Sequence, residues 1–162
     1  MKNQKYDISF KNKKKNNCFR RIWLKNHKSR NNKMKSTKIC IIRSKYNDTS
    51  KLLLSAISEL KKRKVFYKII EVPGAFEIPV AISRNIKKYD GFIAIGSIIK
   101  GETPNFEFIS SAITNGLIQL SILYKKPIGN AILTCISEAQ AKKRGDKGYE
   151  AALAVLEVLN AK

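Results

Sequence analysis

Several residue types on which particular protein classes depend are scarce in this sequence. Its 162 residues include one histidine, His27, and three cysteines without a C-x-x-C pair. A disulfide scaffold is therefore excluded, a zinc module is disfavoured, and the free thiols suit a reducing, cytoplasmic location. No uninterrupted apolar run reaches the roughly 18 residues of a membrane span, so we expect no integral membrane protein.

Acidic residues are also few, with 12 Asp and Glu against 33 Lys and Arg and a net charge of +21. The excess is uneven, because residues 1–37 hold 13 of the basic residues and one acid. This Lys- and Asn-rich stretch lacks apolar periodicity and is predicted to be a disordered N-terminal extension. Residues 38–162 are predicted to form one domain.

The extension mixes aromatic and basic side chains between Cys18 and Lys25. Such a patch could stack on RNA or lie at a membrane surface. Alternatively, the enrichment of the whole chain in Lys, Asn and Ile results from an AT-rich genome, and the extension has no selected function. We expect any nucleic-acid contact to be confined to this extension.

From Lys38 onward, apolar β-branched runs alternate with helical patterns. The predicted strands are 38–44, 65–71, 91–99 and 127–134, and the predicted helices are 48–63, 75–86, one starting near 105, 138–144 and 147–159. Four alternations predict an α/β fold with a four-stranded parallel sheet and right-handed crossovers. The nearly continuous apolar run 91–99 is typical of a strand covered on both faces.

Two helices have apolar stripes from which we predict their buried faces. The helix that starts after Asp48, its expected N-cap, has a stripe of Leu53, Ile57 and Leu60. For the long helix that starts near Asn105, the predicted buried side chains are Phe108, Ile109, Ala112, Ile113, Leu117 and Leu120.

Ligands of open α/β sheets bind beyond the carboxyl ends of the strands. This rule selects four loops: Lys45–Asn47, Val72–Glu77, Ser97–Asn105 and Thr134–Glu138. The sequence has neither G-x-G-x-x-G nor G-x-x-x-x-G-K-[ST], so the common nucleotide-binding motifs are absent.

The third loop has the features of an anion site. At Gly101–Asn105 the chain leaves a strand and starts a helix, where free N–H groups and the helix dipole favour an anion and Thr103 adds a hydroxyl. Glu77, early in its helix, either serves a ligand or simply favours the dipole. Arg144 is either an anion ligand or a solvated cation of the Lys142–Arg144 cluster.

Taken together, these loops resemble the 6,7-dimethyl-8-ribityllumazine synthase family over about residues 39–161. The resemblance is carried by Ser44–Asn47, Val72–Pro79, Ile95–Thr103, Phe106–Phe108, Gln140–Ala141 with Arg144, and Lys147–Gly148 with Glu150–Ala152. It implies a flavodoxin-like three-layer sandwich. It also implies a transferase that condenses 5-amino-6-(D-ribitylamino)uracil with 3,4-dihydroxy-2-butanone 4-phosphate in riboflavin biosynthesis, without a metal or organic cofactor.

The resemblance also implies roles for residues of the first two loops. Tyr46 falls where the family stacks an aromatic ring on the pyrimidine. Ala75, Phe76 and Glu77 fall where the family contacts the ribityl chain.

In the third loop the implied roles concern the pyrimidine and the phosphate. Ser97, Ile98 and Ile99 match the strand end whose backbone contacts the pyrimidine edge. Glu102 and Thr103 match the loop that binds phosphate.

Three features depart from the family pattern. Asn105 stands where the family has its catalytic histidine, and an amide cannot exchange protons near neutrality. Asn130 stands where a neighbouring subunit usually closes the pyrimidine pocket with an apolar side chain. The linker after Arg144, the implied phosphate-binding arginine, is several residues shorter than usual, which bears on assembly beyond the pentamer.

The implied partners are small-molecule substrates, further copies of the chain in a pentamer or a multiple of it, and riboflavin synthase. Two alternatives from other classes stay open at this stage. One is a catalytically weak or inactive paralogue that binds lumazine or flavin, suggested by Asn105. The other is a scaffold or RNA-associated protein that acts through the basic extension, which turnover by extension-deleted protein would argue against.

Overall fold

The computed structural model describes residues 37–161, and the predictions made for residues 1–36 lie outside this range. The elements are β1 (Lys38–Ser44), α2 (Ser50–Lys62), β2 (Phe66–Val72), α3 (Ile78–Asn85), β3 (Gly91–Ile99), α4 (Asn105–Tyr124), β4 (Ile128–Cys135), α5 (Glu138–Lys142) and α6 (Lys147–Asn160). The predicted alternation of strands and helices is confirmed.

The four strands form one parallel sheet in the order β2-β1-β3-β4. The chain therefore moves outward from β1 to β2 and then crosses back to β3 on the other side of β1. This reversal of direction between β1 and β3 is the topological switch point at which ligands of such sheets bind.

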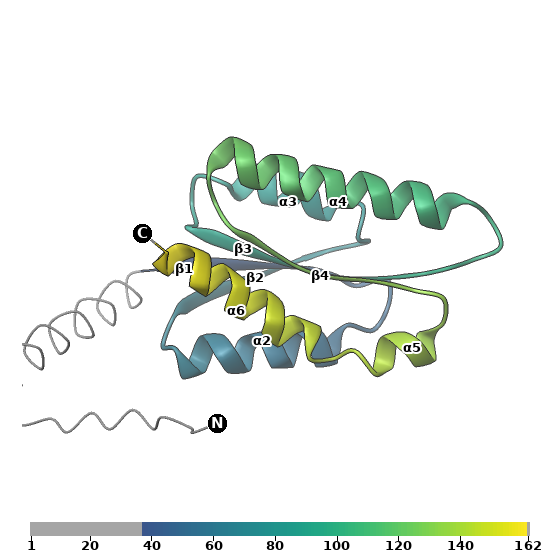
Figure 1. The fold of residues 1–162 in the computed structure, drawn as a ribbon, viewed down its shortest axis with the longest axis horizontal. Helices are drawn as coiled ribbons and strands as arrows, with labels where there is room; N and C mark the ends of the chain where they lie inside the picture. The colour runs from purple at the N-terminus through teal and green to yellow at the C-terminus, as the bar shows by residue number, and fades with distance from the viewer. Residues whose placement is uncertain (1–36, 162) are drawn as a thin grey trace, which may run out of the picture. The chain divides into compact units, whose positions relative to one another are not determined.

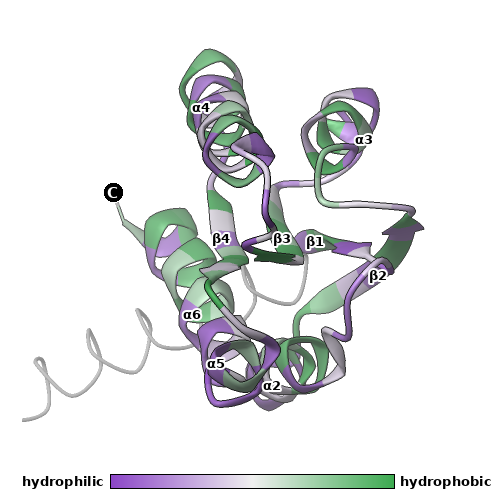
Figure 2. Cartoon of the chain, turned by 90° about the vertical axis from the view of Figure 1, so that its right-hand side faces the viewer, coloured by the Kyte–Doolittle hydropathy of each residue, from purple (hydrophilic) through white to green (hydrophobic). Residues whose placement is uncertain are grey.

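The helices lie in two layers, with α3 and α4 on one face of the sheet and α2, α5 and α6 on the other (Figures 1 and 2). Alternate residues of β1 serve the two cores: Ile39 and Ile41 pack towards α2 and α6, and Cys40 and Ile42 towards α3 and α4. The three-layer α/β sandwich is thus confirmed. Burial raises the pKa of the Cys40 thiol to about 12, so this cysteine is a neutral core side chain.

The buried face of α2 was predicted slightly out of phase. Leu52, Ala56 and Leu60 are buried, whereas Leu53 and Ile57 are only partly buried. The N-cap is Thr49 rather than Asp48, and the Asp48 carboxylate accepts a bond from the Ser50 backbone N–H at 2.9 Å. This bond lowers the pKa of Asp48.

The buried face of α4 was predicted too wide. Ile113 and Leu117 are buried, but Phe108 is 68% exposed and Ala112 is also exposed. Among the described residues α4 is the one helix long and apolar enough to cross a membrane. Polar residues interrupt the apolar run of this helix, and α4 packs on the sheet through Ile113 and Leu117.

Helices α2 and α6 pack closely at the start of α6. A Cβ atom at Gly148 would lie 1.9 Å from the carbonyl oxygen of Leu52 in α2. Beside this contact, the hydroxyl of Ser55 lies 2.7 Å from the carbonyl oxygen of Gly145 and accepts a bond from the Tyr149 N–H at 3.1 Å. Ser55 thereby ties α2 to the short linker that follows Arg144.

Candidate functional site

A cavity of about 390 Å³ opens at the carboxyl edge of the sheet, next to the switch point. Its walls come from the loops after β1, β2 and β3 and from the first turns of α4. Eight of the predicted site residues line it together: Tyr46, Ala75, Phe76, Ser97, Ile98, Ile99, Thr103 and Asn105. Three of the four loops selected by the carboxyl-end rule therefore meet at this cavity.

The floor of the cavity is the end of β3, which forms a step in the sheet. Pairing of β3 with β1 ends at Arg43 and Ile95, whereas pairing with β4 continues to Ile99 and Cys135. The Asn47 side-chain amide donates to the Ser97 carbonyl oxygen at 2.8 Å, on the loop that follows β1. On the side of β1, residues 96–99 of β3 therefore have no strand partner among the described residues.

Two aromatic side chains flank the cavity from different loops. Tyr46 is 85% exposed and Phe76 is 61% exposed, although both line the cavity. Exposed rings at the mouth of a concave site offer apolar faces against which a planar ligand can be buried.

The carboxylate of Glu77 is engaged by the chain itself. It accepts a hydrogen bond from the Gly74 N–H at 2.9 Å and does not line the cavity. Gly74 does line it, and a Cβ there would lie 2.8 Å from Glu77 Oε2. In this geometry Glu77 holds the loop that carries Ala75 and Phe76.

The predicted anion loop reaches the cavity through Gly101, Thr103 and Asn105, whereas Glu102 is exposed and does not line it. The acid in the first turn of α4, Glu107, is paired with Lys100 at 2.9 Å, and this hydrogen bond lowers the pKa of Glu107. The pair offsets the negative charge of Glu107 beside the helix start, so the N–H groups there still favour an anion.

Asn130 and Arg144 do not join this cavity within one chain. They line a second cavity of about 220 Å³ beside the edge strand β4, with Thr134 and Lys147. The Asn130 side chain accepts a bond from the Ile132 N–H at 3.0 Å, and Lys147 is paired with Glu150.

Ten residues of the two cavities were not named as site residues from the sequence: Asn47, Gly74, Gly101, Phe106 and Ile109 in the first, and Ala131, Ile132, Leu133, Thr134 and Lys147 in the second. Asn47 follows Tyr46 in a strand-end loop, so its position gave a usable signal. The sequence contains no such signal for Lys147, because its position beside Arg144 depends on how the short linker folds. Within residues 37–161 no three His, Cys, Asp or Glu side chains gather as metal ligands would.

Comparison with known proteins bears on the same residues. The model of the 6,7-dimethyl-8-ribityllumazine synthase family matches residues 36–162. A protein of that name from Cutibacterium acnes is 44% identical over 100 residues, which are 57% of this chain and 60% of the relative. Another of that name from Methylocella silvestris is 37% identical over 130 residues, which are 72% of this chain and 79% of the relative.

The match thus spans 60% of the length of the first relative and more of the second. The family model covers the whole α/β domain and all three loops of the first cavity. This chain belongs to the 6,7-dimethyl-8-ribityllumazine synthase family.

Proposed function

We propose that the chain condenses 5-amino-6-(D-ribitylamino)uracil with 3,4-dihydroxy-2-butanone 4-phosphate to form 6,7-dimethyl-8-ribityllumazine, with release of phosphate and water. The observation that carries this proposal is the first cavity, which joins two exposed aromatic rings, an open strand end and a helix N-terminus. A planar polar ring and a phosphate need these three features in one place. Family membership supports the same reaction.

In this proposal the uracil ring stacks on Tyr46 and its edge bonds to the backbone at Ser97–Ile99. The ribityl chain passes along Ala75 and Phe76, over the loop held by Glu77. The phosphate lies at Thr103 and the start of α4. The end of β3 and the start of α4 border the same cavity, which supports placing both substrates side by side.

Asn105, the first residue of α4, takes the catalytic position in this proposal. Its amide can orient the substrates by hydrogen bonds but cannot shuttle protons. Holding two reactants in a productive geometry can contribute up to roughly 7 to 11 kcal/mol, whereas acid–base help is worth about 10²- to 10⁴-fold. Turnover without the histidine should therefore be slower but measurable.

The test is turnover by purified full-length protein supplied with both substrates, followed by the absorbance of the lumazine product. Product formation that requires both substrates supports the proposal. Binding of lumazine or flavin without any turnover contradicts it and identifies a ligand-binding paralogue instead.

Arg144→Ala should weaken the binding of one substrate only, the phosphorylated butanone. A guanidinium can make a charge-assisted, bidentate phosphate contact, worth about 1.5 to 3 kcal/mol, so KM for the phosphorylated butanone should rise about tenfold or more. KM for the uracil should stay nearly constant, and Arg144→Lys should recover only part of the loss. Steady-state kinetics with each substrate varied in turn measure both constants.

Lys142→Ala is the matched control, since Lys142 belongs to the same basic cluster but lines neither cavity and is paired with Glu138 at 3.7 Å. It should change neither KM. Equal weakening of both substrates by Arg144→Ala would show that Arg144 does not bind the phosphate.

Because Asn130 and Arg144 line a different cavity from Thr103, we propose that a complete site forms between two copies, in a pentamer or a multiple of it. The exposed apolar side chains of α4 support this assembly: Phe108, Ile118, Ile122 and Leu123 are 53 to 71% exposed. Burial of such side chains between copies contributes about 25 cal/mol per Å².

Sedimentation of the full-length protein should accordingly show a pentamer or larger assembly and little monomer. Ile122→Asp should shift the protein towards smaller species and reduce turnover, because a charge would be buried without a partner. Leu54→Asp, at an α2 position that is 66% exposed, is the control and should leave the assembly intact. A fully active monomer would contradict the shared site.

A further inference from the structure

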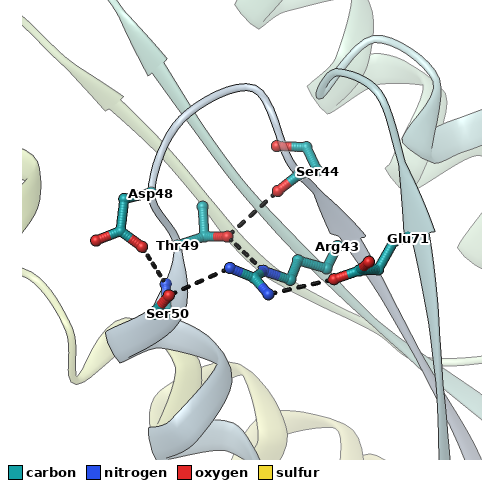
Figure 3. Close-up of polar contacts among 6 residues, drawn as sticks. All are labelled: Arg43, Ser44, Asp48, Thr49, Ser50 and Glu71. Carbon is teal, nitrogen blue, oxygen red and sulfur yellow. Dashed lines mark hydrogen bonds and ion pairs between the residues drawn. The ribbon is translucent and has the colours of Figure 1, made fainter.

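Arg43 is an arginine on a central strand, one residue before the end of β1, with a side chain that is 19% exposed. Figure 3 shows that its guanidinium reaches three partners from two elements and a loop. Nε donates to Thr49 Oγ1 at 2.9 Å, one terminal nitrogen donates to Ser50 Oγ at 3.3 Å, and the other pairs with Glu71 of β2 at 3.2 Å. Arg43 therefore bridges β1, β2 and the start of α2.

The bridged segment is the loop that carries Tyr46. At its entry, the Lys45 N–H donates to the Val72 carbonyl oxygen at 3.0 Å. In its middle, Asn47 is bonded to Ser97. At its exit, Thr49 is 1% exposed and bonds both Arg43 and the Ser44 carbonyl oxygen.

The Tyr46 ring depends on this loop for its direction. Since the side chain is 85% exposed, packing within the chain does little to orient it. Its position is set by a backbone that is bonded before it, after it and, through Arg43, at the helix start. If the end of the loop at Thr49 were less well ordered, the Tyr46 ring would adopt more orientations. A ligand would then have to order the ring on binding, which would lower its affinity.

We infer that Arg43 is a positioning residue for the planar substrate: by clamping the start of α2 to β1 and β2, it orders the loop that presents Tyr46. This inference rests on the proposed function for the identity of that substrate. This positioning role requires arginine, because the planar guanidinium group donates hydrogen bonds in fixed directions to three partners, whereas the ammonium group of lysine acts as a point charge.

The experiment compares Arg43→Ala and Arg43→Lys with the parent by three readouts. These are amide hydrogen exchange, calorimetric binding of ribitylaminouracil alone, and steady-state kinetics. Arg63→Ala is the matched control, because it removes an Arg–Glu pair of the same helix at its far end, where Arg63 binds Glu59 at 2.8 Å.

In Arg43→Ala we expect exchange within residues 45–50 to accelerate about tenfold, while the rest of α2 exchanges as before. Affinity for ribitylaminouracil should fall about fivefold, as the loss of hydrogen bonds to a charged group allows. KM for the butanone phosphate should stay within about twofold of the parent value. Arg43→Lys should recover less than half of the lost affinity, and Arg63→Ala should change neither the exchange of the loop nor the affinity.

Unchanged exchange in residues 45–50, or equal loss of affinity for both substrates, would overturn the inference. So would acceleration spread over all of α2, which would indicate a purely structural role. A parent that binds ribitylaminouracil without turning it over would refute the proposed function alone, since the exchange and binding results would still decide the role of Arg43. A parent that does not bind it would overturn both.

Discussion

Replacing Asn105 with histidine should raise turnover by up to two to four decades, because it restores a side chain that can exchange protons near neutrality. Asn105 lines the cavity and is exposed, so an imidazole there has access to the substrates and to solvent. The gain is limited by the surroundings: a misplacement of 1 Å can cost about 10²-fold.

The pH profile identifies the cause of that gain. The parent should lack a histidine-like inflection, while Asn105→His should acquire one at or below about pH 6.5, because the N-terminus of α4 disfavours the imidazolium. Measuring kcat from pH 5 to 8 tests this.

Asn105→Ala is the control, and it should lose only about 0.5 to 1.5 kcal/mol from the missing amide contact. If the parent is inactive and Asn105→His remains inactive, position 105 is not catalytic and the enzymatic proposal fails.

Gly148→Ala should destabilise the domain by about 3 kcal/mol, because overpacking a rigid contact costs about 1 to 3 kcal/mol and this contact is severe. The added Cβ would meet the Leu52 carbonyl at 1.9 Å and the Ser55 hydroxyl at 2.5 Å. Backbone atoms inside a helix cannot move aside as a side chain does, so α6 would have to shift away from α2. Urea denaturation followed by circular dichroism measures the loss.

Gly101→Ala provides the matched control, since a Cβ there meets no atom within 4 Å. Its stability should stay within about 0.5 kcal/mol of the parent value. Alanine also has the better helix propensity, by roughly 0.5 to 1 kcal/mol. An unchanged or more stable Gly148→Ala protein would therefore show that moving the two helices apart costs no more than this gain, which contradicts the prediction.

The limits of β1 and β3 were predicted correctly because both are buried, β-branched runs bounded by polar residues. The phase of α2 was harder, since Leu52, Leu53 and Leu54 are consecutive and propensity does not distinguish them. Packing against the sheet decides which of the three leucines is buried, and it is Leu52. For α4, periodicity indicates which side chains are apolar but not whether they face the sheet or another copy, so Phe108 was misplaced.

For the candidate site, too, some features could be predicted from the sequence and others depend on packing. Loops at strand ends were found from topology alone, and they bring Tyr46, Phe76 and Thr103 to one cavity. Side-chain direction was not available from the sequence, which explains why Glu77 and Glu102 were expected in the cavity but do not line it. The separation of Arg144 from Thr103 likewise depends on the fold of a short linker.

The step where β3 extends past β1 has a consequence for how binding preference can evolve. In the proposed site this step offers a ligand peptide N–H and C=O groups, which every residue except proline supplies in full. Neutral sequence drift at Ser97, Ile98 or Ile99 therefore leaves the hydrogen-bonding pattern of the step unchanged. A descendant that prefers another ring would acquire that preference through Tyr46 or Phe76, the exposed side chains at the mouth.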